Sequence, residues 1–278
     1  MTVLGSSEVS AFLARLDVLY KHGDFTTVIH ECDKLLRTAA SPSAAVICYR
    51  ARAYRSQGKL AQALSDATEA VRIDRTYAMA HRTLGDIYTI SGNIRAAIEC
   101  CDEALRLDPT LAEAYNTRAG ARLIANQLQE ALADSQQAIR LDPTLWTAYL
   151  TRANARYHLG DAAADEDYVT SYQMNPAMYV KTVVKVINHQ VRQDKNGLLA
   201  NCAMHLRNNP GDVCSLIRRG IAFLLLGRED EAKGDFDRYL QIKPTGQDRL
   251  QQMVDEALRL RGSVPALHSF GESSTGQW

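Results

Sequence analysis

Residues 77–110 read YAMAHRTLGDIYTISGNIRAAIECCDEALRLDPT. The first half places Leu84 and Tyr88 on one stripe of a helix with 3.6 residues per turn. Gly92 interrupts this pattern, because glycine adopts positive φ without steric cost. A second helical pattern follows and ends before Pro109, since the residue before a proline is pushed out of the helical region. The stretch predicts a helical hairpin, which cannot bury its apolar stripes without neighbours.

Copies of this hairpin recur along the chain, and their period is the strongest signal in the sequence. Prolines follow one another at intervals of 34, 33, 34 and 34 residues: Pro109, Pro143, Pro176, Pro210 and Pro244. Turn residues recur in the same register: Gly23, Gly58, Gly92, Asn126, Gly160 and Gly227. Small residues recur where the two helices of each hairpin should cross: Ala51, Gly85, Ala119, Ala153 and Gly220 in the first helix, and Ala63, Ala97, Ala131, Ala164 and Ala232 in the second. This periodicity predicts a stack of hairpins in which each repeat contacts only its neighbours.

The chain resembles the tetratricopeptide repeat family. The resemblance extends over residues 9–244 and is carried in residues 77–110 by Leu84-Gly85, Tyr88, Ala97, Ala104 and Pro109. It implies an all-α fold, a right-handed superhelical α-solenoid of about seven helix-turn-helix repeats plus a C-terminal cap helix.

The predicted solenoid occupies residues 1–262. We expect repeats at about 9–43, 44–77, 78–111, 112–145, 146–178, 179–212 and 213–246, a cap helix at about 247–261, and a mobile tail at 263–278. The sixth repeat is degenerate, and its turn is expected to be displaced to Asn196-Gly197. The cap helix is predicted from apolar residues at helical spacing after Gln247, because the exposed end of a solenoid needs a polar cover.

A charge pairing can be recognised by comparing the repeats with one another. The seventh place of the first helix is usually basic where a leucine would be expected, and the twenty-third place is usually acidic. From the first repeat to the seventh, the seventh place is occupied by Arg15, Arg50, Leu84, Arg118, Arg152, Lys185 and Arg219. In the same order, the twenty-third place is occupied by Glu31, Asp66, Cys100, Asp134, Asp167, Asn201 and Asp235. The repeat that loses its arginine also loses its acid. We therefore predict an ion pair between the two helices of five repeats, directed away from the concave face.

Composition excludes several classes of function. Lys+Arg and Asp+Glu are both 32, so the formal net charge is zero and a general affinity for nucleic acid or acidic membranes is not expected. No apolar run approaches eighteen residues, so we expect no membrane insertion. The N-terminus lacks the pattern of a secretion signal, which favours a cytoplasmic location.

No pattern of catalytic or metal-ligating residues is present, so we expect no enzyme activity, no cofactor and no metal. The seven histidines are scattered, without paired spacing, and no P-loop or nucleophile motif occurs. The cysteines form no C-x-x-C pair: Cys32, Cys48, Cys100, Cys101, Cys202 and Cys214. We interpret them as small buried residues in a reducing cytoplasm, with metal or redox roles as the alternative.

The candidate binding surface is the concave face formed by the first helix of each repeat. In repeats two to five it is polar and mixed in charge, which suits hydrogen bonding to an extended peptide: Arg52, Arg55, Met79, Arg82, Asp86, Glu113, Asn116, Asn154 and Tyr157. In repeats six and seven it becomes apolar: Val180, Val183, Ile187, Ile217, Ile221 and Leu224. The apolar part is either an exposed partner-binding groove or a surface covered by the cap helix or tail.

The sequence therefore predicts a non-enzymatic protein–protein interaction scaffold or adaptor that binds a peptide or partner segment in its concave groove. One alternative is a chaperone or targeting factor for a secreted or membrane-bound client, which would use the apolar groove. Another is RNA binding by a helical repeat array, against which the net charge argues. Family members that clamp the C-terminal carboxylate of heat-shock chaperones use lysine and asparagine in one repeat, asparagine in the next, and lysine and arginine in the third. In repeats two to four this chain has Cys48 and Arg52, then Thr83, then Glu113 and Thr117, so that clamp is absent.

Overall fold

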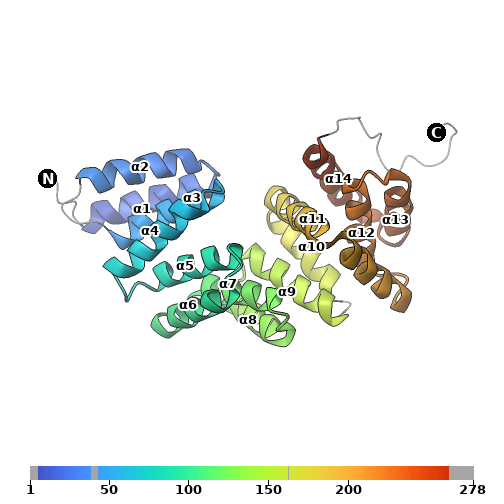
Figure 1. The fold of residues 1–278 in the computed structure, drawn as a ribbon, viewed down its shortest axis with the longest axis horizontal. Helices are drawn as coiled ribbons and strands as arrows, with labels where there is room; N and C mark the ends of the chain where they lie inside the picture. The colour runs from blue at the N-terminus through green and yellow to red at the C-terminus, as the bar shows by residue number, and fades with distance from the viewer. Residues whose placement is uncertain (1–5, 39–42, 162, 263–278) are drawn as a thin grey trace. The chain divides into compact units, whose positions relative to one another are not determined.

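The computed structural model describes residues 6–38, 43–161 and 163–262, and within these ranges the regular structure is entirely helical (Figure 1). The chain divides into two compact units, Met1–Thr151 and Arg152–Trp278, and the division falls within helix α9 (Trp146–Leu159). The all-α solenoid of stacked hairpins and the cap helix are both confirmed. The tail expected at 263–278 lies outside the described residues.

The first unit contains four consecutive hairpins, each made of two antiparallel helices. Their helices are α1 (Ser6–Lys21) and α2 (Phe25–Thr38), α3 (Ala44–Ser56) and α4 (Leu60–Ile73), α5 (Ala78–Ile90) and α6 (Ile94–Leu107), and α7 (Ala112–Ile124) and α8 (Leu128–Leu141). The second helix of each of the first three hairpins also packs against the first helix of the next, so every hairpin in this unit buries apolar residues on a neighbour.

The predicted turn residues all adopt positive φ. The six φ values lie between 59° and 81°, at Gly23, Gly58, Gly92, Asn126, Gly160 and Gly227. Asn126 is the only residue of the set with a side chain, and asparagine is a residue that visits this region routinely. Asn93, which directly follows one of these turns, also accepts a hydrogen bond from the Ala96 amide at 3.4 Å and so caps α6.

After α4, α6 and α8, an aspartate shapes the link to the next helix. Asp108 Oδ1 accepts hydrogen bonds from the Thr110 amide at 2.9 Å and the Thr110 hydroxyl at 2.7 Å. Asp74 with Thr76 and Asp142 with Thr144 form the same turn. The repeated Asp-x-Thr pattern therefore fixes the same tight connection three times in the first unit.

Small residues occupy the helix crossings as predicted. Ala51, Ala97 and Ala119 are fully buried. A Cβ atom at Gly85 would lie only 2.9 Å from Cys101 Sγ, so glycine is needed there for the two helices of the hairpin to approach this closely. The core of the unit is built from these small residues and from branched side chains such as Ile87.

The predicted ion pairs are present in five hairpins. Four arginines bind their aspartates through two hydrogen bonds of 2.6–2.9 Å each: Arg50 with Asp66, Arg118 with Asp134, Arg152 with Asp167, and Arg219 with Asp235. In the first hairpin, Arg15 and Glu31 lie 3.2 Å apart, with the arginine largely exposed. The hairpin α5/α6, which has Leu84 in place of arginine, buries that leucine instead.

Two of these arginines also reach back to the preceding hairpin. Arg50 Nη1 donates to Asp33 on α2 at 2.6 Å, and Arg118 Nη1 donates to Asp102 on α6 at 2.6 Å. The same place in α4 is held by Thr68, and the next hairpin has no arginine to meet it. The pairing therefore links successive hairpins of the first unit at alternate junctions.

The second unit contains the rest of α9 and the helices that follow it. These are α10 (Ala164–Met174), α11 (Pro176–Asn208), α12 (Val213–Leu225), α13 (Glu229–Ile242), the 3₁₀ turn η1 (Pro244–Gly246) and α14 (Gln247–Arg261). The turn expected at Asn196-Gly197 lies instead at Asp194, where the backbone leaves the helical region (φ −151°, ψ 81°). Asp194 accepts a hydrogen bond from the Gly197 amide at 2.8 Å and so caps the second half of α11.

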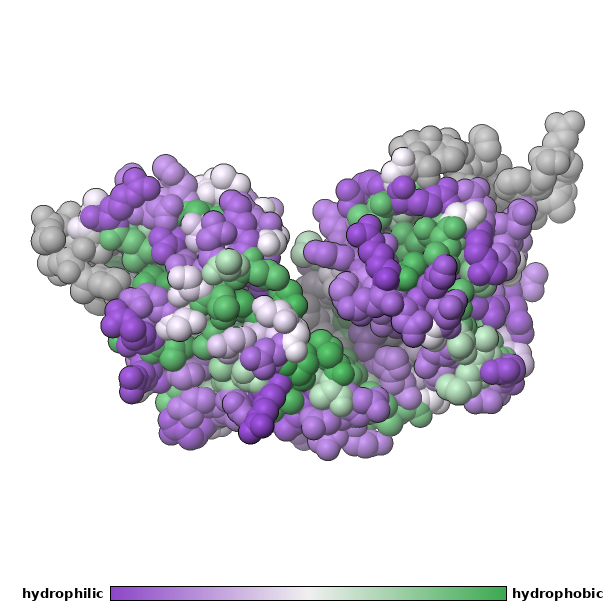
Figure 2. All heavy atoms as spheres, in the orientation of Figure 1, coloured by the Kyte–Doolittle hydropathy of each residue, from purple (hydrophilic) through white to green (hydrophobic). Residues whose placement is uncertain are grey.

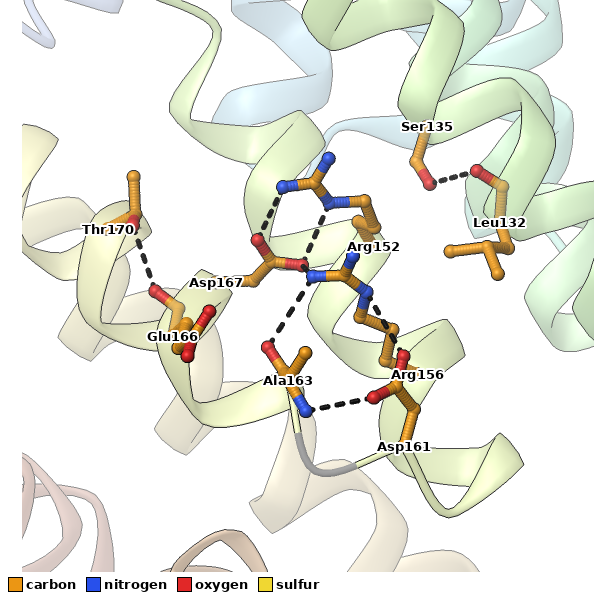
Figure 3. Close-up of polar contacts among 9 residues, drawn as sticks. All are labelled: Leu132, Ser135, Arg152, Arg156, Asp161, Ala163, Glu166, Asp167 and Thr170. Atoms are coloured by element: carbon orange, nitrogen blue, oxygen red, sulfur yellow. Dashed lines mark hydrogen bonds and ion pairs between the residues drawn. The ribbon is translucent and has the colours of Figure 1, made fainter.

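Asp167 in the second unit accepts hydrogen bonds from two arginines of α9 (Figure 3). It receives Arg152 through two hydrogen bonds of 2.8 and 2.6 Å and Arg156 through one of 2.8 Å. Arg156 also lies 3.4 Å from Asp161. Because the carboxylate is nearly fully buried, these contacts offset the cost of removing its charge from water.

Candidate partner-binding surface

Helices α3, α5 and α7 pack side by side in the first unit and bring the predicted polar positions onto one face. Arg55 on α3 and Asp86 on α5 form an ion pair across neighbouring hairpins, with Arg55 Nε 2.9 Å from Asp86 Oδ2. The charge of Asp86 raises the pKa of Arg55 above its ordinary value. These two predicted residues therefore pair with each other across α3 and α5.

Arg82 lies beside this pair and has no hydrogen bond or ion pair with any described residue. Burial lowers its pKa from the ordinary value, against the opposing charge of Asp86, and the positive charges of Arg52 and Arg55 lower it further. Its Nε atom is buried without a partner. The surface thus holds one partly buried guanidinium whose charge the protein does not fully compensate.

Arg52 and Met79 lie at the margins of this surface. The Arg52 guanidinium sits over the rings of Tyr20 and Tyr49, 4.4 and 5.0 Å from their centroids, so it is held by aromatic faces rather than by an acid. Met79 lines an open cleft of about 470 Å³ together with Tyr77 and Leu111.

The third helix of the surface, α7, contributes Glu113 and Asn116, which lie one helical turn apart. The negative charge of Glu113 raises the pKa of Arg82, although burial has the larger effect and lowers it. The Asn116 side-chain amide donates to the Thr147 hydroxyl at 3.1 Å, whereas its carbonyl oxygen is buried and has no partner. A donor at Arg82 and an acceptor at Asn116 therefore remain unsatisfied on adjacent helices of one face.

Asn154 and Tyr157, also expected on this surface, are occupied within the second unit. Asn154 Oδ1 accepts from the Tyr168 hydroxyl at 2.8 Å and from Arg218 Nη1 at 3.3 Å. Tyr157 is buried, and its hydroxyl lies 2.9 Å from Ser215 Oγ. Placing these two residues on a free binding surface was wrong, because side chains of α10 and α12 take up their polar atoms.

The apolar lining predicted in repeats six and seven is covered rather than exposed. α14 packs against both α11 and α12, and its Met253, Val254 and Ala257 are buried there. Val180, Ile187, Ile217, Ile221 and Leu224 are at most 7 % exposed, and Val183 is half-buried. Five of these six residues therefore belong to the core of the second unit, and their assignment as partner-binding residues is corrected. Elsewhere hydrophobic residues are interspersed with hydrophilic ones on the visible face of each unit (Figure 2).

The cysteines are free thiols, and most of them are buried. All six thiols are unpaired, and all but Cys100 are buried. Burial raises the pKa of Cys32, Cys48 and Cys101 to about 12, so these thiols are poor nucleophiles. The described residues contain no group of three side chains arranged to hold a metal ion. None of the described helices is long and apolar enough to cross a membrane.

The family model described as tetratricopeptide repeat matches residues 78–111, the hairpin α5/α6. This hairpin is therefore a tetratricopeptide repeat, and the hairpins stacked beside it have the same helix-turn-helix form. Proteins built from such repeats are, in general, protein–protein interaction scaffolds rather than enzymes. No curated protein sequence matches the chain.

A solved structure shares the fold over most of this chain. The Cut9-Hcn1 hetero-tetramer of the APC/C aligns with a TM-score of 0.58 and 15 % identity over 89 % of this chain and 48 % of that one. The MamA protein aligns with a TM-score of 0.43 and 20 % identity, covering 74 % of this chain and 94 % of that one. The first repeat domain of Spaghetti (RPAP3), bound to an HSP90 peptide, aligns with a TM-score of 0.39 and 23 % identity, covering 42 % and 93 %.

Proposed function

We propose that this tetratricopeptide-repeat protein is a non-enzymatic adaptor that holds an extended segment of a partner protein on the polar face of α3, α5 and α7. The surface comprises Arg52, Arg55, Arg82, Asp86, Glu113 and Asn116. A preformed face lowers the ordering cost of binding, because the helices that present these side chains are already packed.

The observation that carries this proposal is the unpartnered guanidinium of Arg82. A carboxylate from the partner would gain charge-assisted hydrogen bonds from a group already partly removed from water. The buried Asn116 carbonyl oxygen would accept a backbone N–H of the same segment. The partner segment is therefore extended and acidic.

We further propose that the protein acts in a reducing, cytoplasmic compartment and needs no cofactor. Six unpaired thiols suit such a compartment. The apolar groove that a client-binding chaperone would need is covered by α14, which favours the polar face as the binding surface.

Selection of random peptides on the immobilised protein tests the proposal. Selected peptides should be enriched in Asp and Glu, and Arg82→Gln should weaken their binding at least about tenfold, the loss of one charged hydrogen-bonding partner. Arg82→Gln should not lower the melting temperature, because it removes an unpaired cation. Arg95→Gln, at an almost fully exposed arginine on α6, is the matched control and should bind like the wild type. Peptides without acidic enrichment, or equal binding by Arg82→Gln, would refute the proposal.

A further inference from the structure

A small cavity lies in the second unit between α10, α11, α12 and α14, beneath the cap helix. Two arginines line it together with Asp165, Tyr168 and Tyr179. The volume open to the centre of a water molecule is about 20 Å³. That is room for one water molecule or one small ion.

Arg218 on α12 is a buried cation without an acidic partner. Its side chain is 6 % exposed, and its hydrogen-bond acceptors are all neutral. Nη1 donates to Asn154 Oδ1 at 3.3 Å and to the Tyr168 hydroxyl at 3.4 Å, and Nη2 donates to Gln190 Oε1 at 3.2 Å. Nε has no partner. Burying a guanidinium among neutral groups is costly unless a negative charge lies nearby.

Arg249 on the cap helix is the second buried cation at this cavity. It is 5 % exposed, and its Nη2 donates to the Tyr239 hydroxyl at 3.0 Å and to Asp165 Oδ1 at 3.3 Å. Nη1 is buried and has no partner. The same carboxylate of Asp165 also lies 3.3 Å from Lys243 Nζ.

The charges at the cavity therefore do not balance. One carboxylate, that of Asp165, is shared by Arg249 and Lys243, and none faces Arg218. Each of the two buried guanidiniums keeps a nitrogen atom without an acceptor. A single negative charge in the cavity, which both arginines line, would compensate this excess.

We propose that this cavity binds a small inorganic anion of the size of chloride, between Arg218 and Arg249. Arg249 comes from the cap helix and Arg218 from the hairpin beneath it, so the anion ties α14 to α12. A carboxylate of a partner protein would not fit a space this small beneath α14, so the ligand class is a free halide-sized ion.

The melting temperature of the full chain, measured in sodium chloride and in sodium methanesulfonate at equal ionic strength, tests the site. Above its dissociation constant, each tenfold rise in chloride should raise the melting temperature by roughly 2–4 °C, and methanesulfonate should not. Arg249→Gln should lose this chloride dependence. Arg219→Gln is the matched control: it sits beside Arg218 but binds Asp235, so it should lower stability and keep the chloride dependence.

Crystals of the wild-type protein soaked in bromide give a second measurement that does not depend on a variant folding. An anomalous peak between Arg218 and Arg249, together with chloride-dependent melting, supports the site. Melting temperatures that are equal in the two salts overturn the proposal. A bromide peak found together with equal melting temperatures would be an adventitious ion only.

Discussion

Arg118 and Asp134 bind each other through two parallel hydrogen bonds, Nε to Oδ2 at 2.8 Å and Nη2 to Oδ1 at 2.7 Å. Arg122, one turn further along α7, donates to the same carboxylate at 2.6 Å. The Asp134 side chain is 6 % exposed, so this carboxylate serves two arginines in a place nearly free of water. Arg118 and Asp134 join the two helices of one hairpin at their crossing.

Asp134→Ala should lower the free energy of unfolding by about 3–5 kcal/mol, because it leaves Arg122 without its carboxylate and Arg118 with only Asp102, in a partly buried site. Urea denaturation followed by circular dichroism measures the change. Glu130→Ala, at an exposed acid on the same helix, should change stability by less than about 0.5 kcal/mol. Equal stability of the two variants would show that the pair does not hold the hairpin.

The hairpin α5/α6 suggests an apolar replacement for such a pair. Arg219→Leu combined with Asp235→Cys copies its Leu84 and Cys100 into α12/α13, where the arginine and the acid pair with each other. The double variant should be more stable than Asp235→Cys alone by about 1–3 kcal/mol, because the single change leaves a cation unpaired. A double-mutant cycle by chemical denaturation measures the coupling. Additive effects would contradict the prediction.

Two glycines of the second unit should respond to alanine in opposite directions. A methyl group at Gly220 would overlap the ring of the fully buried Phe236, so Gly220→Ala should destabilise by about 1–3 kcal/mol. Gly234, in helix α13, has open space around it, and Gly234→Ala should stabilise by about 0.5–1 kcal/mol. Thermal melts measure both. Adding Phe236→Leu should relieve much of the Gly220→Ala effect, and a lack of relief would show that this overlap is not the cause.

Stability should fall in alkaline solution because of the buried thiols. Burial raises the pKa of Cys32, Cys48 and Cys101 from 9.0 to about 12. Between these values the unfolded chain has released protons that the folded chain still holds, so the stability present below about pH 9 is lost as the pH rises toward 12. Each thiol contributes a slope of about 1.4 kcal/mol per pH unit.

Denaturant midpoints measured from pH 8 to pH 11 test this slope. Cys101→Ala should reduce it by the share of one thiol, whatever the variant does to stability at pH 8. A free energy of unfolding that stays constant across this range would contradict the prediction.

The repeat register, the turn residues and the ion pairs could be predicted because each recurs within the chain. Positive φ at Asn126 and the pairing of Arg118 with Asp134 follow from comparing one hairpin with its neighbours. The neighbours of a residue on the concave face, by contrast, differ from repeat to repeat. Tyr157 has the register of a surface residue, yet Ser215 and Arg218 enclose it through contacts that span about sixty residues.

The same limit explains the error at the apolar lining. Ile187 and Ile221 follow the pattern of an inward stripe, and this pattern is identical whether a partner or the chain's own last helix covers it. The amphipathic spacing of α14 indicated a cap helix, but not which face of α11 and α12 it would occupy. The unpaired state of Arg82 likewise depends on distances between helices, which the sequence does not contain.

The links from Arg50 to Asp33 and from Arg118 to Asp102 make the order of the hairpins matter. A duplicated α3/α4 inserted directly after itself would present its arginine to Thr68, which cannot replace the missing carboxylate. The hairpin α5/α6, by contrast, needs no carboxylate from α4, and its Asp102 accepts from the arginine of the next hairpin, α7/α8. Engineers who lengthen or shuffle this array should therefore move hairpins as matched pairs, α1 to α4 or α5 to α8, rather than as single interchangeable repeats.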